Sequence, residues 1–175
     1  METQMPEPLE TLDLLSQAVI ALLKDEGLVY ANPGEQALTA ELSNLMRPYF
    51  GAWSVSAEWD RKQQEQKMLS YGWLNEVAKL RAIRPDIIVH RIGAPENILV
   101  VEAKRIENRN DAQDKAKLAA MTGPDGGYSY EVGVRLVFDL PNSCIPDCEV
   151  FIAGQSNAEL TQLLRNSLPR KEKAA

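Results

Sequence analysis

The chain has 175 residues, of which 45% are hydrophobic and 25% are charged, and its formal net charge is -6. This composition is typical of a globular domain that folds around a hydrophobic core, and it excludes a disordered or fibrous chain. An acidic total argues against a protein that coats nucleic acid or an anionic membrane by bulk attraction. The longest apolar runs are too short for a membrane span, and the first residues lack a signal-peptide pattern, so we expect a cytoplasmic protein.

The charge is distributed unevenly along the chain. Residues 1–77 carry a net charge of -7 and residues 118–175 carry -2, whereas residues 78–117 carry +3. A charge run usually marks a solvated face, so this basic segment is only weak support for a polyanion-binding surface.

The cysteine and histidine counts and the absence of two sequence patterns exclude three kinds of site. Cys144 and Cys148, with His90 as the single histidine, cannot supply the four ligands of a structural zinc site. The chain also lacks a nucleophile-elbow pattern and a glycine-rich phosphate loop.

Two helices are predicted in the first 50 residues. Apolar residues at spacings of three and four from Leu9 to Leu23 predict an amphipathic helix that ends at Gly27. A second helix is predicted to start at Asn32 as its cap, with Pro33 in its first turn.

The remaining segments predict an α/β fold with a mixed central sheet flanked by helices. The element order is α-α-β-β-β-α-β-β-α, and we expect a single domain over residues 1–175 with its core at about 33–140. The predicted elements are a strand at 53–59, a loop and short helix at 60–80, a hairpin of strands 87–89 and 98–101, a helix from Asn110 or Asp111 through Met121, a strand at 130–138, a short strand at 149–152, a helix at 156–168 and a frayed tail at 170–175.

The predicted hairpin contains Asp86, Glu102 and Lys104. With a turn centred near residues 94–95, positions whose numbers sum to about 188 or 190 lie opposite each other, and such an even register places all three side chains on one face of the sheet. An odd register would separate them.

Two carboxylates and an ammonium group at the ends of apolar strands are costly to bury unless they pair or bind a cation. Mg²⁺ prefers one or two carboxylates, carbonyl oxygens, water and phosphate oxygens. Lys104 beside such an ion would orient or deprotonate a water molecule and balance charge on a reacting phosphate. The cluster therefore has the outline of a phosphodiester-hydrolysis site.

The stretch RPDIIVHRIGAPENILVVEAKR, residues 84–105, resembles the signature of the PD-(D/E)XK nuclease superfamily, which has the restriction-endonuclease-like fold. The order of the predicted elements extends the resemblance over residues 33–140. It implies an αβββαβ core, here with an extra helix before it and a strand and helix after it.

The resemblance also implies roles for individual residues. Asp86, Glu102 and the backbone carbonyl of Ala103 would bind Mg²⁺ or Mn²⁺, and Lys104 would be the catalytic lysine. The first core helix of the family often supplies a further carboxylate, for which Glu41 is the first candidate.

Other residues have weaker assignments. Glu35 is the second candidate for the helical carboxylate, because its position also fits helix capping. Asp114, Lys117 and Leu118 resemble a D..KL pattern of some members, in which Lys117 would contact a phosphate. The candidate nucleic-acid-binding residues are Arg84, Arg91, Arg105 and Lys117.

These inferences predict a metal-dependent endonuclease that acts on nucleic acid, with DNA the favoured substrate, and that forms a homodimer if it cuts both strands. One alternative is a catalytically inactive module of the same fold that binds nucleic acid or a protein. Another is an accidental resemblance, in which Asp86 and Lys104 form an ordinary cross-strand ion pair.

Overall fold

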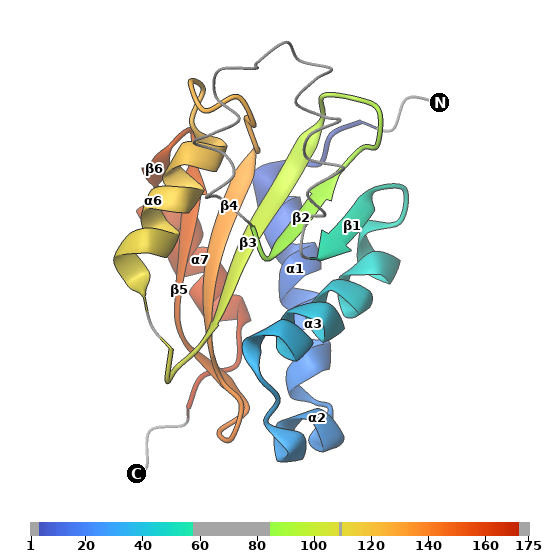
Figure 1. The fold of residues 1–175 in the computed structure, drawn as a ribbon, viewed down its shortest axis with the longest axis vertical. Helices are drawn as coiled ribbons and strands as arrows, with labels where there is room; N and C mark the ends of the chain where they lie inside the picture. The colour runs from blue at the N-terminus through green and yellow to red at the C-terminus, as the bar shows by residue number, and fades with distance from the viewer. Residues whose placement is uncertain (1–3, 58–84, 109, 172–175) are drawn as a thin grey trace.

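A computed structural model describes residues 4–57, 85–108 and 110–171 (Figure 1). These residues form a six-stranded mixed sheet with helices on both faces, which confirms the predicted mixed α/β architecture. The loop and helix predicted for residues 60–80, and Arg84, lie outside the described residues. Within the described part of the chain, no helix is long and apolar enough to cross a membrane.

The strands follow one another across the sheet in chain order, β1-β2-β3-β4-β5-β6. Only β3 and β4 are parallel, and the other neighbouring pairs are antiparallel. A parallel pair needs a crossover connection, which α6 provides. The strands are β1 (Ser54–Ala57), β2 (Ile87–His90), β3 (Asn97–Arg105), β4 (Val132–Asp139), β5 (Cys144–Ile152) and β6 (Gln155–Ser156).

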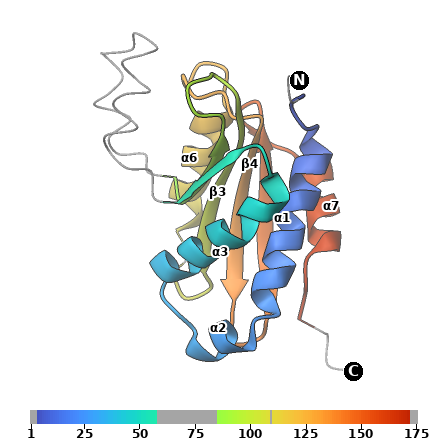
Figure 2. The same ribbon diagram turned by 90° about the vertical axis from the view of Figure 1, so that its right-hand side faces the viewer.

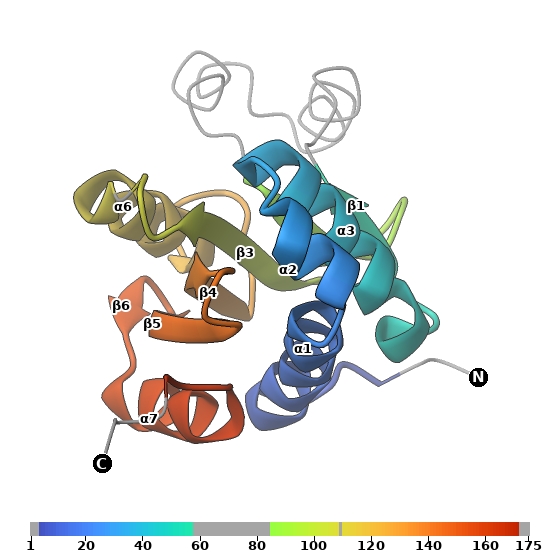
Figure 3. The same ribbon diagram turned by 90° about the horizontal axis from the view of Figure 1, so that it is seen from below.

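The helices divide between the two faces of the sheet. α1, α3 and α7 pack on one face and share a single hydrophobic core with it, whereas α6 covers the other face with a smaller apolar cluster (Figures 2 and 3). The helices are α1 (Pro8–Leu23), α2 (Glu26–Ala31), α3 (Glu35–Phe50), α6 (Asp111–Thr122) and α7 (Ala158–Ser167).

The predicted end of the first helix at Gly27 is wrong. α1 ends at Leu23, and Gly27 lies inside the short helix α2. The physical reason is a local cap, because the Asp25 side chain accepts a hydrogen bond from the Leu28 N–H at 3.0 Å and starts a new helix.

The predicted start of the second long helix is also wrong. Asn32 ends α2 in the left-handed conformation, with φ of 45°, and does not cap the helix that follows. Asparagine tolerates this conformation better than most residues. Gly34 therefore occupies the cap position, and α3 starts at Glu35.

β5 is longer than the predicted strand at 149–152. Pro146 in its first half lacks an N–H group, which argues against a central strand. The pairing of β4 with β5 is irregular between Val137 and Asp139, opposite the segment that contains Pro146. The irregularity accommodates the proline, and the strand continues past it.

Strand alternation gives the sheet one apolar face and one mixed face. Along β3, Leu99, Val101 and Ala103 belong to the core shared with α1, α3 and α7. Val100 packs in the cluster beneath α6, so Glu102 also points to the α6 face. α6 approaches closely because Gly133 has no side chain; a Cβ there would lie 2.9 Å from Thr122 Cγ2.

Charged side chains form a row across the α6 face. Glu102 on β3 lies beside Arg135 on β4, and Arg135 lies beside Glu149 on β5. The Arg135 side chain is 2% exposed, and it pairs with Asp111 of α6 at 3.0 Å and with Asp147 of β5. Ion pairs therefore attach the start of α6 to the sheet.

We predict that Arg135→Met destabilises the protein by about 3 kcal/mol, since removal of one partner from a buried ion network leaves the others unpaired. Arg165→Met is the matched control, because Arg165 also pairs with Asp147, at 3.1 Å, but its side chain is 42% exposed. The control should cost less than about 1 kcal/mol. Equal losses for the two variants in urea unfolding would contradict this account of the network.

Candidate functional site

The hairpin brings Asp86 and Glu102 together. Ile87 pairs with Val101 and Ile88 with Val100, which confirms the predicted even register and places Asp86 opposite Glu102 on the α6 face. Asp86 Oδ2 accepts a hydrogen bond from the Ala103 N–H at 2.8 Å. The carboxylate of Asp86 is therefore fixed against the backbone of β3.

α6 places two further ionisable groups over the hairpin. Lys117 Nζ lies 2.8 Å from Glu102 Oε2, and Asp114 Oδ1 lies 3.9 Å from Lys104 Nζ. We call Asp86, Glu102, Lys104, Asp114 and Lys117 the carboxylate–lysine cluster. Lys104 contacts Asp114 of α6 and Glu35 of α3, and Lys117 contacts Glu102. Asp86 also acts electrostatically on Lys104 across the hairpin and raises its pKa, so the cross-strand attraction of the accidental alternative is present alongside these contacts.

The α3 carboxylate nearest the cluster is Glu35. Its Oε2 lies 4.0 Å from Lys104 Nζ, and its Oε1 accepts a hydrogen bond from Asn108 Nδ2 at 3.4 Å. The first candidate, Glu41, is exposed, and no ion pair or hydrogen bond joins it to the cluster among the described residues. Six residues rotate a helix by about 240°, so the two glutamates point in different directions.

The helical spacing of α6 contains a signal that Asp114 is buried. Asp114 stands four residues before Leu118 and seven before Met121, so it is an acidic residue on the apolar stripe of α6, and it is 3% exposed. Glu35, the second candidate for the helical carboxylate, also fits a capping role by position, but Gly34 is the cap residue and α3 has no side-chain cap hydrogen bond.

Burial dominates the electrostatics of Glu102. Its side chain is fully buried, and burial followed by the charge of Asp86 raises its pKa to about 8 even though Lys117 opposes the shift. Burial also raises the pKa values of Asp86 and Asp114. The three carboxyl groups thus lie in surroundings that disfavour their negative charge.

For Lys104, nearby charges outweigh burial in setting the pKa. Burial lowers its pKa, but the carboxylates of Asp86, Asp114, Glu35 and Glu102 more than offset this and raise the pKa above the usual lysine value. Lys104 is therefore an ammonium ion at neutral pH. In this state it stabilises negative charge and does not accept a proton.

Several carboxylate oxygens in the cluster, and one on the neighbouring Glu35, could accept a further hydrogen bond or bind a cation. Glu102 Oε1, Asp114 Oδ2 and Glu35 Oε2 are buried and lack a hydrogen-bond partner within the described part of the chain. Hard oxygen donors of this kind suit Mg²⁺ or Mn²⁺, with Asp86, Glu102 and the Ala103 carbonyl as ligands. In the described ranges, however, no three His, Cys, Asp or Glu side chains are already arranged to hold a metal ion.

Among the described residues, the candidate nucleic-acid-binding side chains do not gather in one place. Arg91 stacks on Trp53 with its guanidinium carbon 4.8 Å from the ring centroid, at the end of β2 farthest from Asp86. Arg105 donates a hydrogen bond to Asn32 at 3.0 Å. Lys117 is the candidate that lies inside the cluster.

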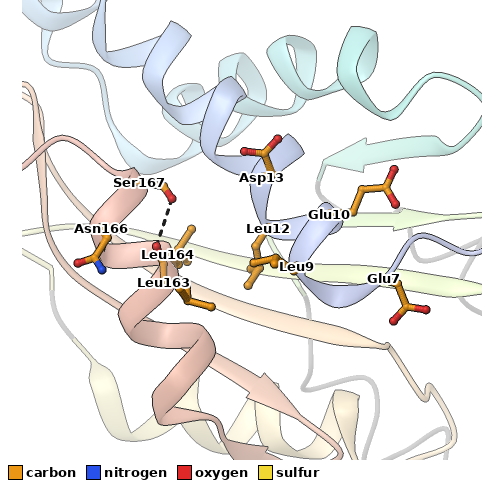
Figure 4. Close-up of a pocket in the computed structure, with 9 residues that line it drawn as sticks. All are labelled: Glu7, Leu9, Glu10, Leu12, Asp13, Leu163, Leu164, Asn166 and Ser167. Carbon is orange, nitrogen blue, oxygen red and sulfur yellow. Dashed lines mark hydrogen bonds between the residues drawn. The ribbon is translucent and has the colours of Figure 1, made fainter.

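A groove of about 680 Å³ lies between the start of α1 and the end of α7, on the face of the sheet opposite α6 (Figure 4). Leu12 and Leu164 line it, and Glu7, Glu10 and Asp13 surround them. Carboxylates at this groove repel phosphate groups, so the groove does not extend the carboxylate–lysine cluster.

No family model matches the chain, and comparisons with curated proteins and with solved structures also give no match.

Glu102→Gln should remove a pH dependence from the stability of the metal-free protein. The glutamate pKa rises from an ordinary 4.5 to about 8 in the fold, so over this range the folded state holds a proton that the unfolded chain has lost. The contribution of Glu102 is full below the unfolded pKa and is lost as the pH rises toward 8. The variant should therefore be the more stable protein at high pH, by roughly a few kcal/mol.

Urea unfolding in EDTA between about pH 5 and pH 8 measures this difference, since a pKa shift converts directly into a pH-dependent free energy. Glu41→Gln is the control, because it neutralises an exposed carboxylate on α3. Parallel stability curves for the wild type and Glu102→Gln would contradict the prediction.

Proposed function

We propose that the protein is a Mg²⁺- or Mn²⁺-dependent nuclease that hydrolyses phosphodiester bonds, with DNA as the substrate. The observation that supports this most directly is the register of β2 and β3, which places Asp86 opposite Glu102 with Lys104 on the same face. The resemblance of residues 84–105 to PD-(D/E)XK nucleases agrees with this assignment, since these are the residues that it names.

The proposed ion is held by Asp86, Glu102 and the Ala103 carbonyl, with Asp114 and Glu35 as nearby acids. Such an ion, when bound, would supply charge neutralisation at the phosphate and a lowered pKa for bound water. The high pKa of Glu102 fits this role. A nearby divalent cation would stabilise the ionised form of a carboxylate that burial and Asp86 otherwise destabilise.

Lys104 supplies a fixed positive charge in this mechanism. Its contacts with Asp114 at 3.9 Å and Glu35 at 4.0 Å hold the ammonium group at the edge of the cluster. An ammonium group placed there stabilises the additional negative charge that develops on a phosphate under attack. In the metal-free protein the raised pKa keeps Lys104 protonated, so its ammonium group is suited to orient a water molecule and to balance charge on the phosphate.

Binding of DNA without metal should be weak. Five basic side chains between residues 85 and 117 have acidic partners within 4.0 Å, so they do not form an uncompensated positive patch: Arg91, Lys104, Arg105, Lys115 and Lys117. A divalent cation changes the charge of the cluster by two units and thereby favours a polyanion.

Lys104→Ala should lower the cleavage rate by about 100-fold or more, since loss of one transition-state charge contact has effects of this size. The assay uses single-stranded DNA, duplex DNA and RNA with Mg²⁺ or Mn²⁺. Glu35→Gln should reduce the rate more than Glu41→Gln, because only Glu35 reaches Lys104. Absence of cleavage of every substrate, or unchanged cleavage by Lys104→Ala, would overturn the enzymatic proposal.

A second candidate is a binding module of the same architecture without turnover. It is favoured by the absence, among the described residues, of three acidic, His or Cys side chains already arranged around a metal position. Mg²⁺ should raise the unfolding temperature of a nuclease by several degrees at about 100 times its dissociation constant, and Asp86→Asn should remove the increase. No metal response, together with retained binding of DNA or a protein partner, would favour the module.

A further inference from the structure

The ion pair between Lys117 and Glu102 lies at the centre of the cluster. Lys117 Nζ is 2.8 Å from Glu102 Oε2, and the two side chains are 13% and 0% exposed. The other carboxylate oxygen, Oε1, is buried and lacks a hydrogen-bond partner in the described part of the chain. Lys117 thus supplies the close positive charge that Glu102 needs when it is ionised.

The same oxygen atoms are those that a divalent cation needs. A metal ion held by Asp86 and Glu102 would lie next to the same carboxylate as the Lys117 ammonium group. Two cations at such a short separation repel each other. Lys117 and the metal ion are therefore alternatives at Glu102.

We propose that Lys117 is an internal substitute cation for Glu102, which the metal ion displaces, and that the displaced lysine then binds a phosphate of the substrate. The inference rests on the proposed nuclease function and adds a regulatory contact to it. Metal binding and phosphate binding are then coupled through a single side chain.

The surrounding structure allows this exchange without movement of the helix. Asp111 at the start of α6 pairs with Arg135, and Lys115 pairs with Glu149 at 2.8 Å. Leu118, the residue after Lys117, is fully buried beneath the helix. α6 is therefore attached on both sides of Lys117, and the long flexible lysine stem is the part that can change direction.

Lys117→Met tests the proposal, and Lys115→Met is its matched control. Both remove one positive charge from α6, but Lys115 contacts Glu149 and its side chain is 43% exposed. Mg²⁺ titrations followed by thermal unfolding, repeated at several pH values, give the half-saturating Mg²⁺ concentration of each variant and separate displacement of the lysine from displacement of a proton at Glu102. We expect this concentration to fall about tenfold in Lys117→Met, because the metal ion no longer competes with the lysine for Glu102. In the control it should change less than about twofold.

A second measurement detects the phosphate contact. At saturating Mg²⁺, Lys117→Met should raise the KM for duplex DNA, and the slope of log KM against log salt should fall by about one, as expected for one lost phosphate contact. Tighter metal binding combined with weaker substrate binding is a pattern that general loss of structure would not produce. Lys117→Gln, which keeps a hydrogen-bond donor without the charge, repeats the test if Lys117→Met does not fold.

The outcomes separate the two proposals. If the wild type responds to Mg²⁺ and cleaves DNA, but neither Lys117 variant binds Mg²⁺ more tightly, the displacement proposal is overturned and the nuclease proposal stands. If the wild type shows neither a Mg²⁺ response nor cleavage, both proposals are overturned.

Discussion

The buried carboxylate of Glu102 is the constraint on which this architecture depends. It lies under α6 with no exposed surface, opposite Asp86, and the nearest counter-charge comes from Lys117. An unpaired negative charge in such a place would cost several kcal/mol. The raised pKa of Glu102 keeps the group protonated below about pH 8, and Lys117 of α6 pairs with it when it is ionised. The position of the helix and the charge of the cluster are therefore determined together.

The two faces of the sheet are held to their helices by different interactions. The face covered by α1, α3 and α7 supplies most of the hydrophobic core, which includes Val101 and Ala103 of β3. The α6 face has only a small apolar cluster and uses ion pairs such as Arg135 with Asp111 to hold its helix. This division leaves one face of a stable sheet available for charged groups that a core would exclude, and the proposed chemistry lies there.

An acidic protein can still act on a polyanion if its charge changes locally. The chain has a net charge of -6, and the basic side chains of residues 85–117 described above have acidic partners. The acidic groove between α1 and α7 adds to the repulsion on the other side of the molecule. A divalent cation at Glu102 would reverse this balance at one place and release Lys117, so binding and metal loading become one event.

The sequence by itself determined the local parts of this protein. Alternation and the turn predicted the β2–β3 hairpin, and an even register left Glu102 or Lys104 as the residue opposite Asp86, because paired strands have a fixed two-residue period. The observed register selects Glu102. Helix ends and long-range contacts were decided only by tertiary structure. The choice of Glu35 over Glu41 required the direction of α3 relative to β3, and the Lys117–Glu102 pair required the crossover that brings α6 over the sheet. Such contacts depend on how elements pack, which periodicity does not encode.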